Sequence, residues 1–284
     1  MTLLRAIQVA HRYTQRAQAV SLIMSLVIAS LGVLAKMVYS PLLPAATIIG
    51  AGWAGVYAVA LAPRLGRYLR TSAILQEMLD VALFGIPWNA VLVGPQLSED
   101  DVSRLSRRFR GDEASLRDYY LVAAVNGPYD VLFCLEQNLA WGSRVRRRFA
   151  DLLLSFVTAW CAAGIIVGVA VGSTVSDLVT VWFVPSLGLL LYCSAGARAQ
   201  ILTTRERIRV VGLVRALMDD SSAPSLADDK AFAVFARQVQ DVLFLARRQE
   251  PRTPHWFFGL FHDDDIADFR YKMRALEQRI GIGH

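Results

Sequence analysis

The chain has 284 residues, of which 55% are hydrophobic and 19% are charged. Soluble globular domains carry about a quarter charged residues, so this composition argues against an ordinary soluble protein. The formal net charge of +6 is compatible with nucleic-acid binding. The distribution of the basic residues explains the excess by itself, however, and we expect no nucleic-acid partner.

Four long intervals of the chain contain no charged residue. A helix rising about 1.5 Å per residue needs about 20 residues to cross about 30 Å of hydrocarbon. The sequence therefore predicts an all-α integral membrane protein with two transmembrane helical hairpins, 17–63 and 152–197. The intervals are Arg16 to Lys36 (19 residues), Lys36 to Arg64 (27), Asp151 to Asp177 (25) and Asp177 to Arg198 (20).

The basic residues orient these spans. Of the 30 Lys and Arg residues, Lys36 alone falls in the short loops within the hairpins. By the positive-inside rule, this places both termini in the cytoplasm, with a cytoplasmic N-terminal segment (1–16), a helical insert (64–151) and a helical tail (198–284). A cleavable signal peptide is the alternative for the first interval, but cleavage would put the two Arg-rich regions on opposite sides.

Helical periodicity continues through the insert. Apolar residues from Ile74 to Ala82 recur at helical spacing and extend the second span, and Gly85 ends that helix. A later helix is expected from about Asp130, running through Trp141 into the third span.

The tail follows a similar pattern. Ser225 followed by Asp228 begins a helix whose apolar residues recur between Phe232 and Ala246, and Pro251 and Pro254 end it. An aromatic turn follows, and a last polar helix is expected from about Asp265 to Ile280.

Two features of the spans have more than one interpretation. Gly164, Gly168 and Gly172 repeat every four residues in the third span, so this face serves either packing within the four helices or a seam between subunits bordering a pore. Pro185 in the fourth span removes one helix hydrogen bond, and the resulting kink is either static or a hinge. No Asp, Glu, Arg or His lies inside a span, which argues against an ion-coupled transporter.

The remaining charged motifs favour no enzyme. The run Arg144–Arg148 before the third span is either an anchor for anionic lipid or an anion site. His262–Asp265 is either a helix cap or a cation site, with the cap preferred. No nucleophile elbow, phosphate-binding loop or paired metal-ligand motif occurs, so we expect no catalytic residues, no metal and no cofactor.

The junction after the second span carries a family signature. It reads Gln76-Glu77-x2-Asp80-x3-Phe84-Gly85-Ile86-Pro87-Trp88-Asn89, and Asp118-Tyr119-Tyr120 follows in the middle of the insert. With Gln137-Asn138 before the third span and Arg252-x-Pro254-x-Trp256 in the tail, nearly the whole chain resembles the SMODS-associating four-transmembrane effector family.

The resemblance implies a membrane effector of bacterial antiphage systems that respond to cyclic oligonucleotides. It implies a homo-oligomer in the bacterial inner membrane, in contact with lipid, that permeabilises the membrane when the nucleotide appears. Alternatives are a non-pore scaffold that recruits a cytoplasmic partner and a constitutive channel or transporter. Candidate nucleotide contacts, each also interpretable as core or anchor, are Trp88, Asn89, Arg117, Tyr119, Tyr120 and Arg144.

Overall fold

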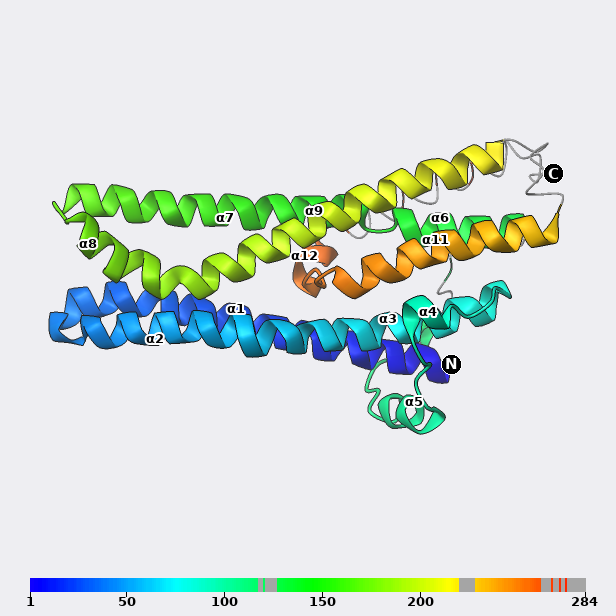
Figure 1. Cartoon of the computed structure of the whole chain (residues 1–284), viewed down its shortest axis with the longest axis horizontal. Helices are drawn as coiled ribbons and strands as arrows, with labels where there is room; N and C mark the ends of the chain where they lie inside the picture. The colour runs from blue at the N-terminus through cyan, green and yellow to red at the C-terminus, as the bar shows by residue number, and fades with distance from the viewer. Residues whose placement is uncertain are drawn as a thin grey trace. The chain divides into compact units, whose positions relative to one another are not determined.

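Every secondary-structure element among the described residues is helical. The computed structural model describes residues 1–116, 120, 127–219 and 228–261, with 267, 271 and 274. No strand occurs within these ranges, so the all-α prediction is confirmed. The α-helices in Figure 1 are α1 (Thr2–Val38), α2 (Leu43–Val56), α3 (Ala62–Phe84), α4 (Ala90–Val93), α5 (Glu99–Ser106), α6 (Tyr129–Ala140), α7 (Ser143–Ala170), α8 (Val175–Leu178), α9 (Val184–Asp219), α11 (Asp229–Gln249) and α12 (His255–Gly259).

Four helical stretches are long and apolar enough to cross a membrane, as the charge-free intervals predict: Thr2–Val38, Ser40–Phe84, Tyr129–Ala170 and Val175–Asp219. In the most apolar segment of each stretch, no more than 33% of the residues are buried inside the protein. Their apolar side chains are therefore available to contact lipid.

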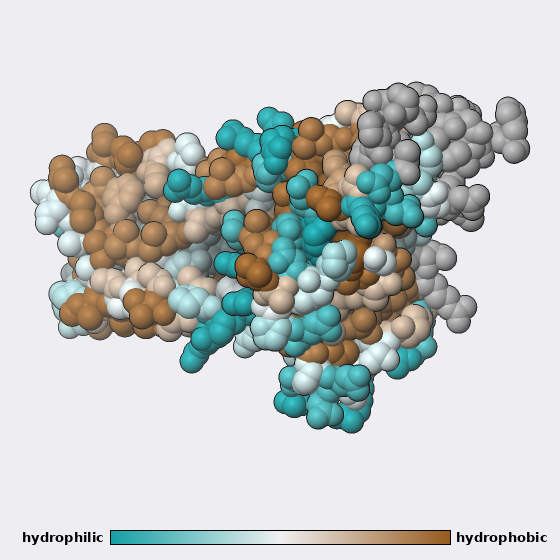
Figure 2. Space-filling model, turned by 45° about the vertical axis from the view of Figure 1, so that its right-hand side comes forward, coloured by the Kyte–Doolittle hydropathy of each residue, from teal (hydrophilic) through white to brown (hydrophobic). Residues whose placement is uncertain are grey.

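The chain divides into two compact units. We call Tyr13–Tyr68 with Arg147–Ile201 the apolar unit, and Met1–Arg12, Leu69–Arg146 and Leu202–His284 the polar unit. Figure 2 shows hydrophobic side chains covering the visible face of the apolar unit, whereas hydrophilic side chains gather over the polar unit. Each of α1, α3, α7 and α9 contributes residues to both units.

Tryptophan–serine hydrogen bonds connect helices inside the apolar unit. Trp53 Nε1 on α2 donates to Ser25 Oγ on α1 at 2.9 Å, and Trp160 Nε1 on α7 donates to Ser186 Oγ on α9 at 2.8 Å. Ser25 and Ser186 are both fully buried. Because lipid offers these groups no partner, each pair satisfies polar atoms that would otherwise destabilise the bundle.

Pro185 lies where three helices approach closely. A π-helical turn over Val179–Phe183 precedes it, and Figure 1 shows the helix bending between α8 and α9. A Cβ built on Gly50 of α2 would lie 2.4 Å from Pro185 Cα, and one on Gly32 of α1 would lie 2.7 Å from Pro185 Cγ. The residue singled out from the sequence as a kink is thus packed against glycines of the first and second spans.

The glycines of the third span face the fourth. A Cβ on Gly164 would lie 2.6 Å from Trp182 Cδ1, and one on Gly168 would lie 3.1 Å from Leu178 Cδ1. Gly172, with φ +65°, follows the end of α7 in a left-handed conformation that favours glycine. Gly164 and Gly168 thus lie at close contacts within the chain and Gly172 at the chain reversal, while the seam between subunits stays a prediction.

The polar unit has its own hydrophobic core. Leu132, Phe133 and Leu139 of α6 are buried against α9 and α11, represented by Val214 and Leu243. The predicted continuous helix from Asp130 into the third span is wrong, because α6 ends at Ala140 and α7 starts at Ser143. Gly142 has φ +67°, which is outside the helical region, and it turns the chain between the two helices.

Helix ends in this unit largely follow the predicted signals. Gly85, with φ +65°, directly follows α3. The predicted start at Ser225 lies outside the described residues, and Asp228 itself caps α11: its carboxylate accepts from the backbone N–H of Lys230 at 3.0 Å. The helix ends at Gln249, just before the predicted Pro251. The aromatic turn contains the short helix α12, and the expected last helix lies largely outside the described residues.

Candidate functional site

Two carboxylates enter the core of the polar unit from α3. Glu77 and Asp80 are fully buried and lie one helical turn apart. They share a helix face with the buried Ala73 and Ile74, so packing of the apolar residues also carries both charges inside. Buried ionised carboxylates destabilise a fold strongly unless charged or hydrogen-bonding partners accompany them.

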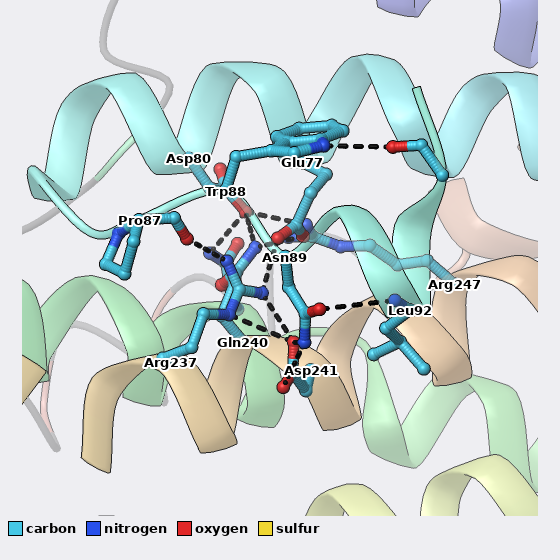
Figure 3. Close-up of polar contacts among 12 residues, drawn as sticks. Glu77, Asp80, Pro87, Trp88, Asn89, Leu92, Arg237, Gln240, Asp241 and Arg247 are labelled. Carbon is cyan, nitrogen blue, oxygen red and sulfur yellow. Dashed lines mark hydrogen bonds and ion pairs between the residues drawn. The ribbon is translucent and has the colours of Figure 1, made fainter. Parts of the chain in front are cut away.

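Helix α11 supplies those partners, as Figure 3 shows. Arg237 Nη2 lies 2.5 Å from Glu77 Oε1, and Arg247 Nη1 donates to Asp80 Oδ2 at 2.6 Å. Gln240 Nε2 donates to Glu77 Oε2 at 2.8 Å and to Asp80 Oδ2 at 3.0 Å. Burial raises the pKa of Glu77, while Arg237 and Gln240 oppose that shift.

The Trp88–Asn89 turn docks on the same helix. Asn89 Nδ2 donates to both carboxylate oxygens of Asp241, at 3.1 and 3.0 Å, while its Oδ1 accepts from the Leu92 backbone N–H and caps α4. Arg237 Nη1 donates to the Pro87 carbonyl at 3.0 Å, and Trp88 Nε1 donates to the Gly94 carbonyl at 2.9 Å. The family signature thus forms a turn that is held onto α11 (Figure 3).

Tyr120 joins this network from the insert. Its hydroxyl donates to Asp80 Oδ1 at 2.6 Å and accepts from Asn138 Nδ2 at 2.8 Å. Its ring centroid lies 5.7 Å from that of Phe84. Asp80 therefore receives hydrogen bonds from α11 and from the insert, with Asn138 of α6 contributing at 3.4 Å.

A second buried ion cluster surrounds Glu250, directly after α11. Its carboxylate pairs with Arg207 of α9 at 2.7 Å and with Arg146 of α7. Arg207 Nη1 also donates to the Asn138 carbonyl at 3.0 Å. Burial raises the pKa of Glu250, but Arg146, Arg207 and Arg252 outweigh burial and leave the pKa below its ordinary value. Glu250 is therefore ionised at neutral pH.

Arg252 reaches the two remaining long helices. Its Nη2 lies 2.6 Å from Nε2 of His11 on α1, and it donates to Ser72 Oγ and Gln76 Oε1 of α3 at 3.1 Å each. Burial, reinforced by Arg252 and Arg247, holds the pKa of His11 well below its usual value. Because the imidazole is neutral, its Nε2 accepts the hydrogen bond from Arg252.

The structure brings together three of the six candidate nucleotide contacts. Trp88, Asn89 and Tyr120 all belong to the network around α11. Arg144 is exposed near the start of α7. Arg117 and Tyr119 lie outside the described residues, as does His262–Asp265.

The ion pairs around α11 and Glu250 were not identified from the sequence. Arg237, Gln240 and Arg247 recur at spacings of three and seven among the apolar residues of α11. Polar residues on an apolar helix face indicate buried ion pairs or hydrogen bonds, so the sequence pattern of α11 could have revealed this network. Their partners Glu77 and Asp80 stand out in the sequence only as part of the family signature.

The site is suited to connecting helices. Within the described ranges no group of three His, Cys, Asp or Glu residues is arranged to hold a metal ion. Burial, with Asp130 and Asp80, raises the pKa of Cys134 to about 12, so its thiol stays protonated at neutral pH. The carboxylates and guanidiniums of the candidate site are paired with one another, and this pairing fixes their geometry.

Four apolar helical stretches and a separate polar unit define a multi-pass α-helical membrane protein. The family model of the SMODS-associating 4TM effector domain matches residues 1–276, so the chain belongs to this family and the predicted membership is confirmed. The chain is also 27% identical over 221 residues to a probable CBASS effector molecule of Bacillus cereus (strain VD146), covering 77% of this chain and 73% of the relative. No solved structure matches the chain.

Proposed function

We propose that this protein is a CBASS effector that senses a cyclic oligonucleotide through its polar unit and then permeabilises the bacterial inner membrane. The observation that carries the proposal is the whole-chain family match, supported by the similarity to a probable CBASS effector molecule. On this proposal both termini are cytoplasmic, the functional form is a homo-oligomer surrounded by lipid, and the protein catalyses no reaction.

The division into two units supports a sensor joined to a membrane device. The described ion pairs among Glu77, Asp80, Arg237 and Arg247 all lie in the polar unit. Moving a closed-to-open ratio from 1:99 to 99:1 needs a ligand that binds the open state about 10⁴-fold more tightly. On this proposal, the ligand acts by changing the hydrogen bonds and ion pairs that connect the helices of the polar unit.

The candidate contacts divide into two roles in this proposal. Trp88, Asn89 and Tyr120 direct polar atoms to protein partners, so we assign them to positioning the sensor. Exposed Arg144, together with Arg117 and Tyr119, is assigned to the nucleotide, because guanidiniums bind phosphates and aromatic rings stack on bases.

The alternatives differ in their dependence on the signal. A scaffold that recruits a partner would release no dye from vesicles, and a constitutive channel would release dye without any nucleotide. The proposed effector releases dye only when the nucleotide is present.

The test uses the full-length protein in vesicles of phosphatidylethanolamine and phosphatidylglycerol loaded with a self-quenching dye. A panel of cyclic di- and trinucleotides is added, and linear dinucleotides serve as the control. Release with at least one cyclic species and none with linear ones is expected. Absence of release across the panel, or equal release without nucleotide, would contradict the proposal.

A further inference from the structure

The segment Glu250–Pro251–Arg252 contacts four long helices at once. Glu250 pairs with Arg146 of α7 and Arg207 of α9. Arg252 hydrogen-bonds to His11 of α1 and to Ser72 and Gln76 of α3. Two residues of the tail thereby tie together all four helices that contribute to both units.

These contacts lie near the points at which the four helices pass from one unit to the other. The polar unit gives way to the apolar unit after Arg12 and Arg146, and it resumes at Leu69 and Leu202. His11, Ser72, Arg146 and Arg207 are therefore within about two helical turns of those points along their own helices. The contacts of Glu250 and Arg252 therefore restrain the four helices close to the residues at which each helix leaves the polar unit.

The contacts are also buried. The side chains of Glu250, Arg207 and Arg146 are 6%, 3% and 16% exposed. Ion pairs screened from water by protein hold a geometry more firmly than exposed pairs, and loss of one partner leaves the other charge unfavourably buried.

Helix α11 joins this segment to the candidate sensor. It carries Arg237 and Asp241, which hold the Trp88–Asn89 turn, and it ends at Gln249, next to Glu250. The backbone N–H of Glu250 still donates to the Ala246 carbonyl at 3.0 Å, so the segment is attached directly to the last turn. A shift of α11 would move Glu250 and Arg252 together.

We propose that Glu250–Arg252 is an autoinhibitory clasp that keeps α1, α3, α7 and α9 in the closed arrangement until the signal releases it. The proposal rests on the proposed function, since it assigns the closed state of that effector to a specific contact. Release frees the four helices to separate, while the carboxylate and guanidinium of the clasp become hydrated.

The test compares Glu250→Gln and Arg252→Gln in the full-length protein with Glu206→Gln as matched control. Glu206 also forms an ion pair, with Arg209 at 2.5 Å, but the two side chains are 46% and 58% exposed, respectively. In dye-loaded vesicles without nucleotide, both clasp variants are expected to leak at least tenfold faster than wild type, and the control is expected to match wild type. Folded clasp variants with wild-type leakage and wild-type nucleotide response would overturn the proposal.

A measurement on wild type keeps the test decisive if the variants fail to fold. Hydrogen exchange of the backbone amides of 249, 250, 252 and 253 is followed before and after addition of the cyclic nucleotide panel, since Pro251 has no N–H. Loss of protection together with dye release is expected, whereas dye release with unchanged protection would overturn the clasp. If no nucleotide causes release from wild-type vesicles, the proposed function fails, and nucleotide-free leakage of the variants still tests the clasp separately.

Discussion

Asn89 hydrogen-bonds to Asp241 across 152 residues of sequence while it caps α4. Its Nδ2 donates to both carboxylate oxygens, and its Oδ1 accepts from the backbone N–H of Leu92 at 3.2 Å. The amide thus performs two structural roles with its two ends. At this position aspartate would repel Asp241, and serine would be too short to reach it.

Substitutions of Asn89 separate these two roles. Asn89→Ala removes the cap and the bonds to Asp241, and we expect a loss of about 2 kcal/mol in unfolding free energy. Asn89→Ser keeps a capping oxygen and loses the contact with α11, so a loss of about 1 kcal/mol is expected. Thermal unfolding in detergent, followed by circular dichroism at 222 nm, measures both. Equal melting temperatures for the two variants would contradict the dual role.

Much of the fold was predictable because hydrocarbon imposes simple requirements. Charge-free intervals of sufficient length identify the four spans, and Gly85 marks the end of α3 through its backbone conformation. The break at Gly142 was missed because the apolar periodicity continues across it. The non-helical ψ of Trp141 (126°) and the positive φ of Gly142 together separate α6 from α7.

The ion network was less predictable for a different reason. Glu77 and Arg237 are 160 residues apart, and nothing local in the sequence pairs them. A single sequence can show that a charge lies on an apolar helix face, but the identity of its partner depends on which faces meet. For the same reason, the side chains that Glu250 and Arg252 contact emerge only from the packed structure.

Asp80 accepts more hydrogen bonds than any other carboxylate described in the polar unit, so we expect loss of its charge to lower the unfolding free energy most. Asp80→Asn removes the counter-charge that lies 2.6 Å from Arg247, which is 5% exposed. Loss of one partner from a buried ion pair lowers the unfolding free energy by about 3–5 kcal/mol. A sharply lower melting temperature in detergent is therefore expected.

The control for this variant is Arg209→Gln, which disrupts an exposed ion pair on α9. Exposed pairs contribute about 0–1 kcal/mol, so its melting temperature should stay close to that of wild type. A similar decrease in both variants would show that burial of Asp80 has no special weight.

His11 is expected to make the protein less stable in mild acid. Its pKa is depressed in the folded state, so the unfolded chain binds a proton first as the pH falls below about 6.5. The unfolded state then holds more protons, and stability decreases by up to about 1.4 kcal/mol per pH unit. A decline in melting temperature between pH 6.5 and 5.5 is the expected observation.

His11→Gln should abolish most of this decline. The Gln side-chain oxygen can accept from Arg252 as the imidazole does, and it does not titrate in this range. Exposed His255→Gln serves as the control: because His255 makes only the smallest contribution to the lowered pKa of His11, this variant should retain most of the wild-type pH dependence. If His11→Gln and wild type decline in parallel, the neutral imidazole at Arg252 does not govern acid stability.

Glycines of α2 allow a direct test of packing in the apolar unit. A Cβ on Gly50 would lie 2.4 Å from Pro185 Cα, whereas nothing lies within 4 Å of one on Gly52 or Gly55. Because the obstacle at Gly50 is backbone, Gly50→Ala forces α2 and α9 apart and should lower the unfolding free energy by about 1–3 kcal/mol. Gly52→Ala meets open space and should be neutral or stabilising by up to about 1 kcal/mol through helix propensity.

If the two variants melt at the same temperature in detergent, the close approach of α2 to Pro185 does not contribute to stability. If Gly50→Ala also leaks dye without nucleotide while Gly52→Ala does not, this approach contributes to the closed state as well.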